Sequence, residues 1–280
     1  MLIKKRKLGL ALGSGGSRGV AHIGFLQALE ELGIKPDFIS GCSMGAVVGA
    51  AYASGFPLEE MRKAVMGLRF MDLFDVNSKP GGVLDTRKIR KLLERYIGDL
   101  YFDELKIPFT CVAVDMVSQQ LVEFSSGKVL DAVIASSSIP SVFKPMEKDG
   151  MRLVDGGVLQ RVPVQQVKNM GADKVVAVDV LGKISTKEKC PNTIMMLSEV
   201  ISLMDNYRTA RTHTDTKDII DLWLEPDLGD MSQYSFKGLA FAYEKGYELG
   251  MEHSAEIKDL IRLNSPRRAD GLKRSMDFKG

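Results

Sequence analysis

The sequence predicts an α/β fold in which helices cover both faces of a mostly parallel sheet. Short apolar runs of strand length alternate with longer segments of helical spacing, which is the pattern of parallel strands joined by crossover helices. The run Lys174–Val180 is apolar almost throughout, as expected for a strand that is buried on both faces. The 280 residues, of which 45% are hydrophobic and 26% charged, are enough to bury a sizeable core.

The elements follow from this pattern in chain order. The strand at 120–124 is expected to pair with the strand before it, and Pro140 and Pro145 fix the turn after one of the helices. Asp85 precedes an amphipathic helix that ends at Ile97. The predicted strands cover 7–12, 38–40, 109–116, 120–124, 152–154, 174–180 and 219–224, and the predicted helices cover 20–32, 44–54, 58–68, 86–97, 128–137, 164–170, 193–211 and 237–263.

Neither an internal repeat nor an interdomain linker is found. Residues 1–263 are therefore expected to form a single domain, followed by a basic, flexible tail over 264–280. Within the region 57–97, the apolar stretch 70–74 lies between two amphipathic helices and precedes a Pro-Gly-Gly break. It could form a lid over an acyl-binding pocket or pack in the core, and both interpretations stay open.

Charge and hydropathy restrict the partners. A net charge of +2 is too small to indicate nucleic-acid binding. Positive charge gathers in residues 4–7 and in the tail, so the two ends could touch an anionic membrane surface transiently, or they could simply be solvated. No apolar run approaches the roughly 18 residues of a membrane span, and residues 1–12 lack the apolar region of a signal peptide. We expect a cytoplasmic protein, at most peripheral at the membrane.

Cysteine spacing gives no sign of a metal site. Cys42, Cys111 and Cys190 are scattered and odd in number, so they predict neither a disulfide framework nor a metal centre. Two of them stand in apolar runs and are interpreted as small buried hydrophobic residues. No metal or other cofactor is expected.

A glycine-rich loop, Gly13-Ser14-Gly15-Gly16-Ser17-Arg18-Gly19, joins the first predicted strand to a helix. Arg18 stands where the dinucleotide-binding pattern needs glycine, and no Gly-Lys-Ser/Thr follows for a P-loop. What remains is a bend of backbone N–H groups at a helix N-terminus, which favours negative charge. An oxyanion hole requires such donors.

The stretch Gly41-Cys42-Ser43-Met44-Gly45 follows a short apolar strand and leads into a helix of small residues. A Gly-x-Ser-x-Gly turn between strand and helix is typical of a nucleophile elbow, which exposes the serine hydroxyl. The turn is too tight for a Cβ at Gly41 or Gly45. The alternative is a glycine-rich connection with an incidental serine.

Ser43 needs a base, and histidine is the usual one. Neither His213, at the polar and apparently solvent-facing end of a helix, nor His253, in a charged helix, lies in a strand-end loop, and His22 is interpreted as a packed or capping residue. The carboxylate candidate is Asp155, which follows an apolar strand and precedes Gly156 and Gly157. A simple Asp-Gly turn is the alternative for it, and two further carboxylates at strand ends are rivals, Asp115 and Asp179.

These motifs together resemble the patatin-like phospholipase family in its small bacterial form. That family combines a glycine-rich loop ending in Arg/Lys-Gly, a Gly-x-Ser-x-Gly elbow and an Asp-Gly-Gly/Ala motif, and the segment 135–145 is similar to a fourth family block. The resemblance spans roughly residues 8–180. It implies a three-layer αβα sandwich with a central mostly parallel sheet, and a Ser–Asp dyad that needs no histidine.

Residue by residue, the resemblance makes Ser43 the nucleophile and Asp155 the base. It places the oxyanion hole at Gly15, Gly16, Ser17 and Arg18, with the amides of Gly15 and Gly16 as donors and Arg18 supporting the loop. The remaining glycines of the motifs support these turns: Gly13, Gly19, Gly41, Gly45, Gly156 and Gly157.

The implied function is that of a lipid acyl-ester hydrolase, a phospholipase A or lysophospholipase-like esterase that works through an acyl-enzyme. Two alternatives stay open: an acyltransferase that uses the same serine, and a non-catalytic lipid-binding regulator. Neither the lipid, the ester position nor a homo-oligomeric state follows from the sequence.

Overall fold

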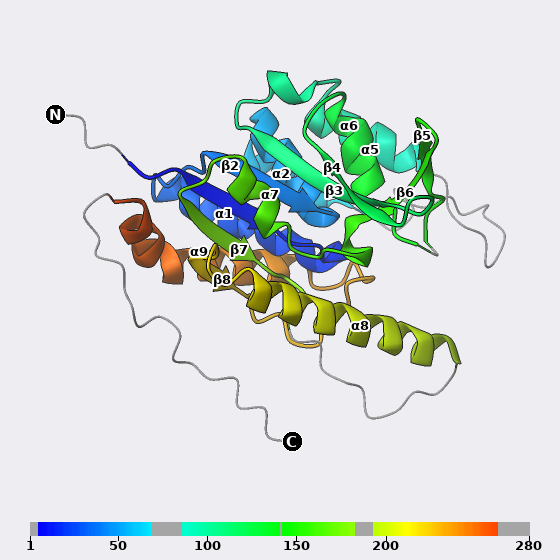
Figure 1. The fold of residues 1–280 in the computed structure, drawn as a ribbon. Coiled ribbons are helices and arrows are strands. Elements are labelled where there is room, and N and C mark those ends of the chain that lie inside the picture. The colour runs from blue at the N-terminus through cyan, green and yellow to red at the C-terminus, as the bar shows by residue number, and fades with distance from the viewer. Residues whose placement is uncertain (1–4, 69–85, 141, 183–192, 263–280) are drawn as a thin grey trace.

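The computed structural model describes residues 5–68, 86–140, 142–182 and 193–262. In this part of the chain, eight strands form one mixed sheet in the order β5-β6-β3-β2-β1-β7-β8, with β4 paired to β3 (Figure 1). Five strands are parallel: β1 (Leu8–Leu12), β2 (Phe38–Cys42), β3 (Phe109–Asp115), β7 (Lys174–Val178) and β8 (Leu222–Leu224). The antiparallel strands at one edge are β4 (Gln120–Phe124), β5 (Met146–Lys148) and β6 (Met151–Asp155).

Helices cover both faces of this sheet, so the three-layer αβα prediction is confirmed. The described α-helices are α1 (Ala21–Glu31), α2 (Met44–Ser54), α3 (Leu58–Met66), α5 (Arg87–Ile97), α6 (Val129–Ser136), α7 (Val164–Asn169), α8 (Thr193–Asp215) and α9 (Leu239–Ile261). Short 3-10 helices are η1 (Gly16–Val20), η2 (Phe102–Glu104) and η3 (Gly156–Val158). Among the residues that the structure describes, no helix is long and apolar enough to cross a membrane.

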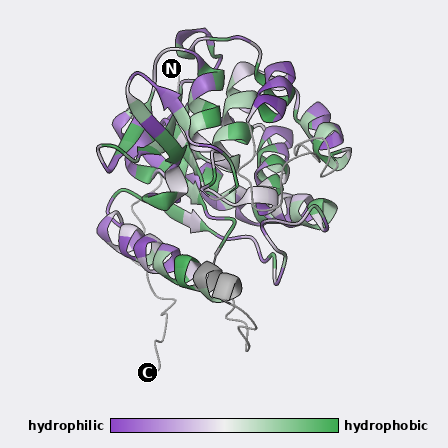
Figure 2. Cartoon of the chain, turned by 90° about the vertical axis from the view of Figure 1, so that its right-hand side faces the viewer, coloured by the Kyte–Doolittle hydropathy of each residue, from purple (hydrophilic) through white to green (hydrophobic). Residues whose placement is uncertain are grey.

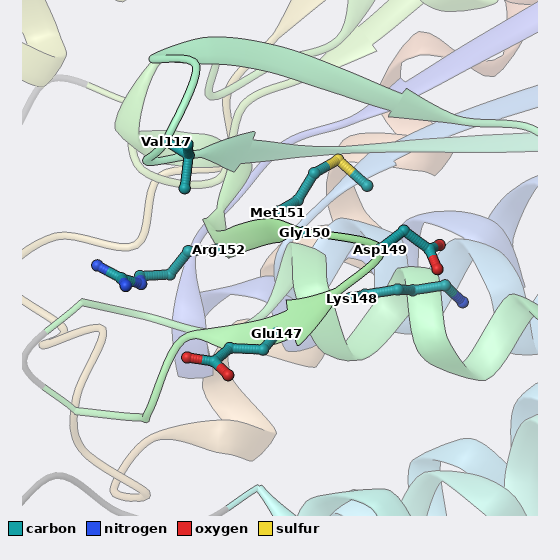
Figure 3. A pocket seen from close by; sticks show the side chains of 7 residues that line it. All are labelled: Val117, Glu147, Lys148, Asp149, Gly150, Met151 and Arg152. Atoms are coloured by element: carbon teal, nitrogen blue, oxygen red, sulfur yellow. The ribbon is translucent and has the colours of Figure 1, made fainter.

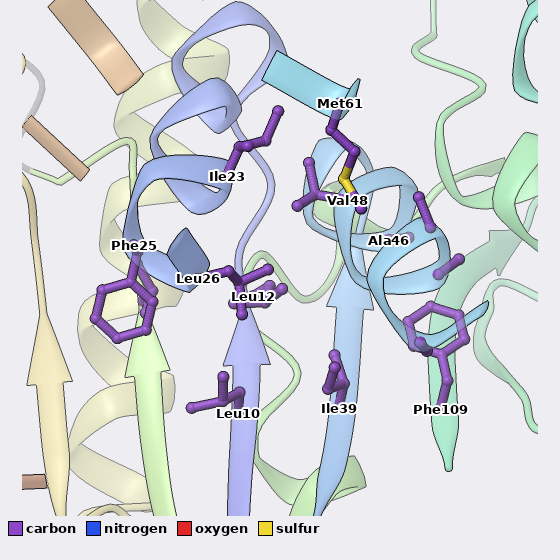
Figure 4. Close-up of a cluster of buried hydrophobic side chains, with 14 of the residues drawn as sticks. Leu10, Leu12, Ile23, Phe25, Leu26, Ile39, Ala46, Val48, Met61 and Phe109 are labelled. Carbon is purple, nitrogen blue, oxygen red and sulfur yellow. The ribbon is translucent and has the colours of Figure 1, made fainter. Parts of the chain in front are cut away.

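The core lies in two layers because the side chains of β1 alternate. Leu10 and Leu12 pack with α1, α2 and α9 on one face (Figure 4), whereas Ala11 packs with the valines of α7 on the other. α9 lies directly against α1 because glycines remove side chains from the contact. A Cβ at Gly246 would stand 1.8 Å from the carbonyl oxygen of Ala21.

Most predicted elements agree with the structure to within a few residues, with two differences around the end of α8. That helix continues to Asp215, and the backbone N–H groups of Ile219 and Ile220 donate to Thr216 in a turn, so β8 begins only at Leu222. The candidate lid stretch 70–74 and the tail 264–280 lie outside the described residues.

The parallel strands all end on one side of the molecule, at the right of Figure 1. β1 and β2 run into the glycine loop and the Gly-x-Ser-x-Gly turn there, and in parallel α/β sheets ligands bind beyond the carboxyl ends of the strands. Figure 2 faces this end.

Candidate active site

Ser43 stands between β2 and α2 with the backbone that a nucleophile elbow requires. Its φ is 53° and its ψ −121°, a conformation that costs energy for a non-glycine residue, and its side chain is buried. The hydroxyl does not cap the helix, so it is not occupied by the N–H groups of the first turn of α2. A Cβ at Gly41 would stand 2.6 Å from Ala46, and one at Gly45 would stand 2.2 Å from the carbonyl oxygen of Leu12.

The glycine loop packs against this elbow. A Cβ at Gly19 would stand 2.3 Å from Met44, the residue after Ser43. The carbonyl oxygen of Gly13 accepts a 2.8 Å hydrogen bond from Nε2 of His22, which helps to hold the start of the loop. The loop and the elbow are therefore in direct contact, although 22 residues of sequence separate Gly19 from Gly41.

The amides of the loop differ in what they bind. Ser17 donates its N–H to the carbonyl of Gln233, and Arg18 donates its N–H to the carbonyl of Gly15. Within the described part of the chain, the amides of Gly15 and Gly16 donate to no other group. Ser17 and Arg18, also predicted for the oxyanion hole, therefore use their N–H groups to hold the loop in shape.

A loop near the C-terminus (228–235, called here the C-terminal loop) fixes the glycine loop from outside. The Arg18 guanidinium donates to the carbonyls of Val180, Gly229 and Met231 at 2.8, 3.3 and 3.1 Å. Gly16 has a φ of +52°, and a Cβ there would stand 2.3 Å from the carbonyl oxygen of Gln233. The C-terminal loop carries no sequence signal for this role.

Asp155 ends β6 next to the elbow. Its Oδ1 accepts hydrogen bonds from the amide of Gly157 at 2.8 Å and from the thiol of Cys42, the residue before Ser43, at 3.8 Å. Burial raises the pKa of Asp155 to about 6, while the bonds from Ser43, Gly157 and Cys42 act in the opposite direction. Gly156 is required because a Cβ would stand 2.4 Å from the carbonyl oxygen of Val112.

The segment 135–145 joins the two groups. The buried hydroxyl of Ser136 accepts a 2.9 Å hydrogen bond from the amide of Ser43, and the carbonyl of Ser138 accepts a 3.0 Å bond from the amide of Asp155. Sequence reasoning assigned no role to these serines. The signal that could have found them is the likeness of the segment to a fourth family block.

Buried ion pairs connect the site to α8. Arg161 donates to Asp179 at 2.6 Å and to Asp205 of α8 at 2.8 Å, and its carbonyl accepts the amide of Ser14 in the glycine loop at 2.9 Å. Arg208 of α8 donates to the carbonyl of Val158, three residues after Asp155. The strand ends, the glycine loop and α8 are thus fixed to one another.

The rival bases have other partners. Asp179 is paired with Arg161, and Asp115 closes the turn after β3 by accepting from Val117 and Ser118, which lower its pKa. His22 is buried beside Gly13, and burial lowers its pKa to about 4.

The other two histidines belong to helices. His213, expected to face solvent, instead packs on the ring of Trp223 with centroids 4.6 Å apart, and His253 faces Glu256 on α9. All three histidines are described, and none of their contacts is with Ser43.

A hollow of about 410 Å³ lies at the β5–β6 hairpin, lined by Val117 and residues 147–152 (Figure 3). None of the predicted site residues lines it. Its wall is largely charged, and Lys148 pairs with Asp131 at 2.9 Å, so it does not suit an acyl chain. Over the described ranges, no group of three or more His, Cys, Asp or Glu side chains could hold a metal ion, and Cys42 and Cys111 are free and buried.

The family model described as patatin-like phospholipase matches residues 10–168, which is more than half of the chain. The chain belongs to the patatin-like phospholipase family. The matched region includes the glycine loop, the elbow with Ser43 and the Asp-Gly-Gly motif of Asp155, whereas α8 and the C-terminal loop lie beyond it.

Several curated proteins of this family are similar to part of the chain. An uncharacterised NTE family protein of Mycobacterium tuberculosis is 39% identical over 179 residues, which are 63% of this chain and 49% of the relative. The neuropathy target esterase sws of Drosophila melanogaster is 31% identical over 181 residues, 62% of this chain and 13% of the relative. A lysophospholipase of Neosartorya fischeri is 28% identical over 313 aligned positions, which cover 94% of this chain and 20% of the relative. The chain spans about half the length of the mycobacterial relative, and less of the others.

Among solved structures, VipD from Legionella pneumophila superposes with a TM-score of 0.58 at 14% identity, over 90% of this chain and 67% of that one. This likeness concerns the fold, and it extends to the elements beyond the family match.

Proposed function

We propose that the protein hydrolyses acyl esters of lipids through a Ser43–Asp155 dyad and an acyl-enzyme intermediate. Membership of the patatin-like phospholipase family supports a lipid ester as substrate, and the lysophospholipase among the relatives makes lysophospholipids the first class to test. The single observation that carries the proposal is the position of Ser43 on a strained elbow beside a buried carboxyl group, since the thiol of Cys42, the residue before Ser43, donates to Asp155.

The chemistry follows from these two side chains. Asp155 takes the hydroxyl proton as Ser43 Oγ attacks the ester carbonyl carbon, and a tetrahedral oxyanion forms. A pKa of about 6 leaves the carboxyl mostly ionised at neutral pH, yet makes it a stronger base than an ordinary aspartate. The proton passes to the leaving alcohol, the acyl group stays on Ser43, and water that is deprotonated by Asp155 then releases the fatty acid.

The amides of Gly15 and Gly16 are the proposed oxyanion donors, because they have no backbone acceptor among the described residues and belong to the loop that packs against the elbow. One such donor contributes about 3–4 kcal/mol to transition-state stabilisation in other hydrolases. The roles of Ser17 and Arg18 are to hold this loop through Gln233 and the C-terminal loop.

The test compares variants in the hydrolysis of a lysophospholipid and of a water-soluble short-chain ester. Ser43→Ala and Asp155→Asn should abolish both, whereas His213→Ala and His253→Ala should retain nearly full activity, since these histidines bind Trp223 and Glu256. Loss of activity in a folded histidine variant would refute the dyad. Products analysed with an added alcohol acceptor separate hydrolysis from acyl transfer.

A further inference from the structure

His22 lies completely buried in the first turn of α1, directly after the glycine loop. Its Nε2 stands 2.8 Å from the carbonyl oxygen of Gly13, the residue at which β1 passes into the loop. The ring also faces the far end of the loop, since a Cβ at Gly19 would stand 3.7 Å from the Cδ2 of His22. One side chain thus contacts both ends of the glycine loop.

The hydrogen bond to Gly13 fixes the tautomer of this ring. A carbonyl oxygen can only accept, so Nε2 carries the proton. Nδ1 is buried and has no hydrogen-bond partner among the described residues, so a second proton there would bury an unpaired N–H on a cation. Burial lowers the pKa of His22 to about 4, while the bond to Gly13 and the charge of Asp179 act in the opposite direction, and Asp179 is already paired with Arg161. His22 is therefore a neutral donor at neutral pH.

The bond from His22 acts on the peptide unit that joins Gly13 to Ser14. The carbonyl of this unit accepts from His22, and its N–H donates to the carbonyl of Arg161 at 2.9 Å. Because a peptide unit is planar, one bond on each side fixes how it is turned. Gly13 has no Cβ to restrict that rotation, so the two bonds are needed. The next peptide unit carries the N–H of Gly15, and its direction depends on the unit before it.

The surroundings of His22 are rigid. A Cβ at Gly45 would stand 2.6 Å from the same carbonyl oxygen of Gly13, so the helix of the elbow packs against the group that the ring binds. On α1, the residue before His22 is in close contact with α9, where a Cβ at Gly246 would stand 1.8 Å from the carbonyl oxygen of Ala21. The ring is therefore supported by α9 and in turn supports the loop beside the elbow.

We propose that His22 is a positioning residue of the active site, whose neutral Nε2–H holds the Gly13–Ser14 peptide so that the amides of Gly15 and Gly16 face the oxyanion. In this role His22 neither touches the substrate nor carries a proton. The inference deepens the proposed function and rests on it.

Three roles for His22 make different demands on the side chain. Packing in the core requires only volume, and proton transfer requires a group that titrates. Positioning requires an N–H at the place of Nε2. Glutamine puts an amide N–H near that place, whereas the shorter asparagine puts one near Nδ1 and does not reach Gly13. The substitutions His22→Gln, His22→Asn and His22→Leu therefore separate the three roles.

The test measures kcat and KM of the full chain with a water-soluble short-chain ester. His22→Leu and His22→Asn should lower kcat by about 10²-fold and leave KM nearly unchanged, because a displaced oxyanion donor is missed mainly in the transition state. His22→Gln should recover most of this loss, although glutamine cannot carry the proton as histidine can.

Thr110→Val is the matched structural control. The buried Thr110 hydroxyl donates to the carbonyl of Phe124 at 2.9 Å, near the start of β3 and away from the carboxyl ends of the strands. Like His22→Leu, this substitution removes a buried side-chain bond to a backbone carbonyl, so both should lower the midpoint of urea denaturation. Only His22→Leu should lower kcat.

Nitrogen-15 NMR of the wild-type protein with labelled histidine tests the tautomer without any substitution at the site. The signal of His22 is identified by its absence from His22→Gln. We expect a neutral ring with its proton on Nε2 from about pH 5 to 8. A proton on Nδ1, or a ring that becomes charged within this range, would contradict the assignment.

Three kinetic results would overturn the proposal: a wild-type kcat in His22→Leu, equal losses in His22→Gln and His22→Asn, or a loss in Thr110→Val as large as that in His22→Leu. The same assay includes Ser43→Ala and Asp155→Asn. Activity that survives in either of these variants refutes the dyad, whereas the results at His22 refute only the positioning role, so the two failures are distinguishable.

Discussion

At the scale of single residues, the site depends on two unfavourable arrangements that the fold maintains. Ser43 adopts a positive φ without being glycine, and Asp155 keeps a carboxyl group away from water. Both cost free energy, the first through backbone strain and the second through desolvation. The compensation comes from neighbours such as Ser136, which accepts the Ser43 amide, and Gly157, which donates to Asp155.

The pH dependence of activity should report Asp155. The base must be ionised, and burial places its pKa at about 6. We therefore expect kcat/KM for a soluble ester to be constant at neutral pH and to fall about tenfold per pH unit below 6. An activity midpoint near 4, the ordinary value for a solvated aspartate, would show that the group in control is not this buried carboxyl.

The same pKa makes a prediction about stability. The folded carboxyl has a pKa of about 6 and the unfolded one 3.8, so the folded state binds more protons between these values and stability falls as the pH rises from about 4 to 6. Asp155→Asn removes this loss. It should raise the free energy of unfolding by about 3 kcal/mol above pH 6 and leave it nearly unchanged below pH 4, as measured by urea denaturation. A variant less stable than wild type at pH 7 would contradict the assignment.

At the scale of elements, the segment 135–145 helps to fix the positions of Ser43 and Asp155. It ends α6 and accepts one hydrogen bond from the amide of each member of the proposed dyad, at the Ser136 hydroxyl and at the Ser138 carbonyl. Because β2 and β6 are separated in the sheet by β3, this segment links Ser43 to Asp155 outside the strand pairing, in addition to the bond from the Cys42 thiol to Asp155.

Ser136→Ala should leave the buried amide of Ser43 without its acceptor. We expect a loss of about 1–3 kcal/mol in unfolding free energy together with a lower kcat, because the elbow is no longer held. The control is Ser137→Ala at the next position, where the hydroxyl bonds only to the carbonyl of Val133 in its own helix. Equal effects of the two substitutions in both measurements would remove the role assigned to Ser136.

At the scale of the whole molecule, the part beyond the family match completes the site. α8 contributes Asp205 to the buried pairs of Arg161, and the C-terminal loop binds Arg18 and Ser17. The glycine loop is thus held between the N-terminal sheet and residues more than 200 positions later.

Arg161→Met tests this coupling. It leaves the buried Asp179 without its cation and removes the 2.8 Å partner of the half-buried Asp205, and breaking a buried pair costs about 3–5 kcal/mol of unfolding free energy. Thermal unfolding should show a clear drop in Tm. Arg62→Met, which breaks an exposed pair with Glu59, should change Tm little. A small effect of Arg161→Met would mean that α8 is not anchored through these pairs.

Features that depend on a few adjacent residues could be predicted from the sequence. The elbow, the glycine loop and the apolar strands each follow from a few adjacent residues, and the structure has them within a few positions of the prediction. The partners of Arg18 and Arg161 could not be predicted, because Met231 and Asp205 are remote in sequence and stand in no motif.

The central claim is that Ser43 is activated by Asp155 and not by a histidine. The most direct test is labelling with a fluorophosphonate, followed by mass spectrometry of the peptide that contains residue 43. We predict an adduct on Ser43 in wild type, His213→Ala and His253→Ala at similar rates, and a rate lower by about 10²–10⁴-fold in Asp155→Asn. Labelling of Asp155→Asn at the wild-type rate, or its loss in either folded histidine variant, would contradict the dyad.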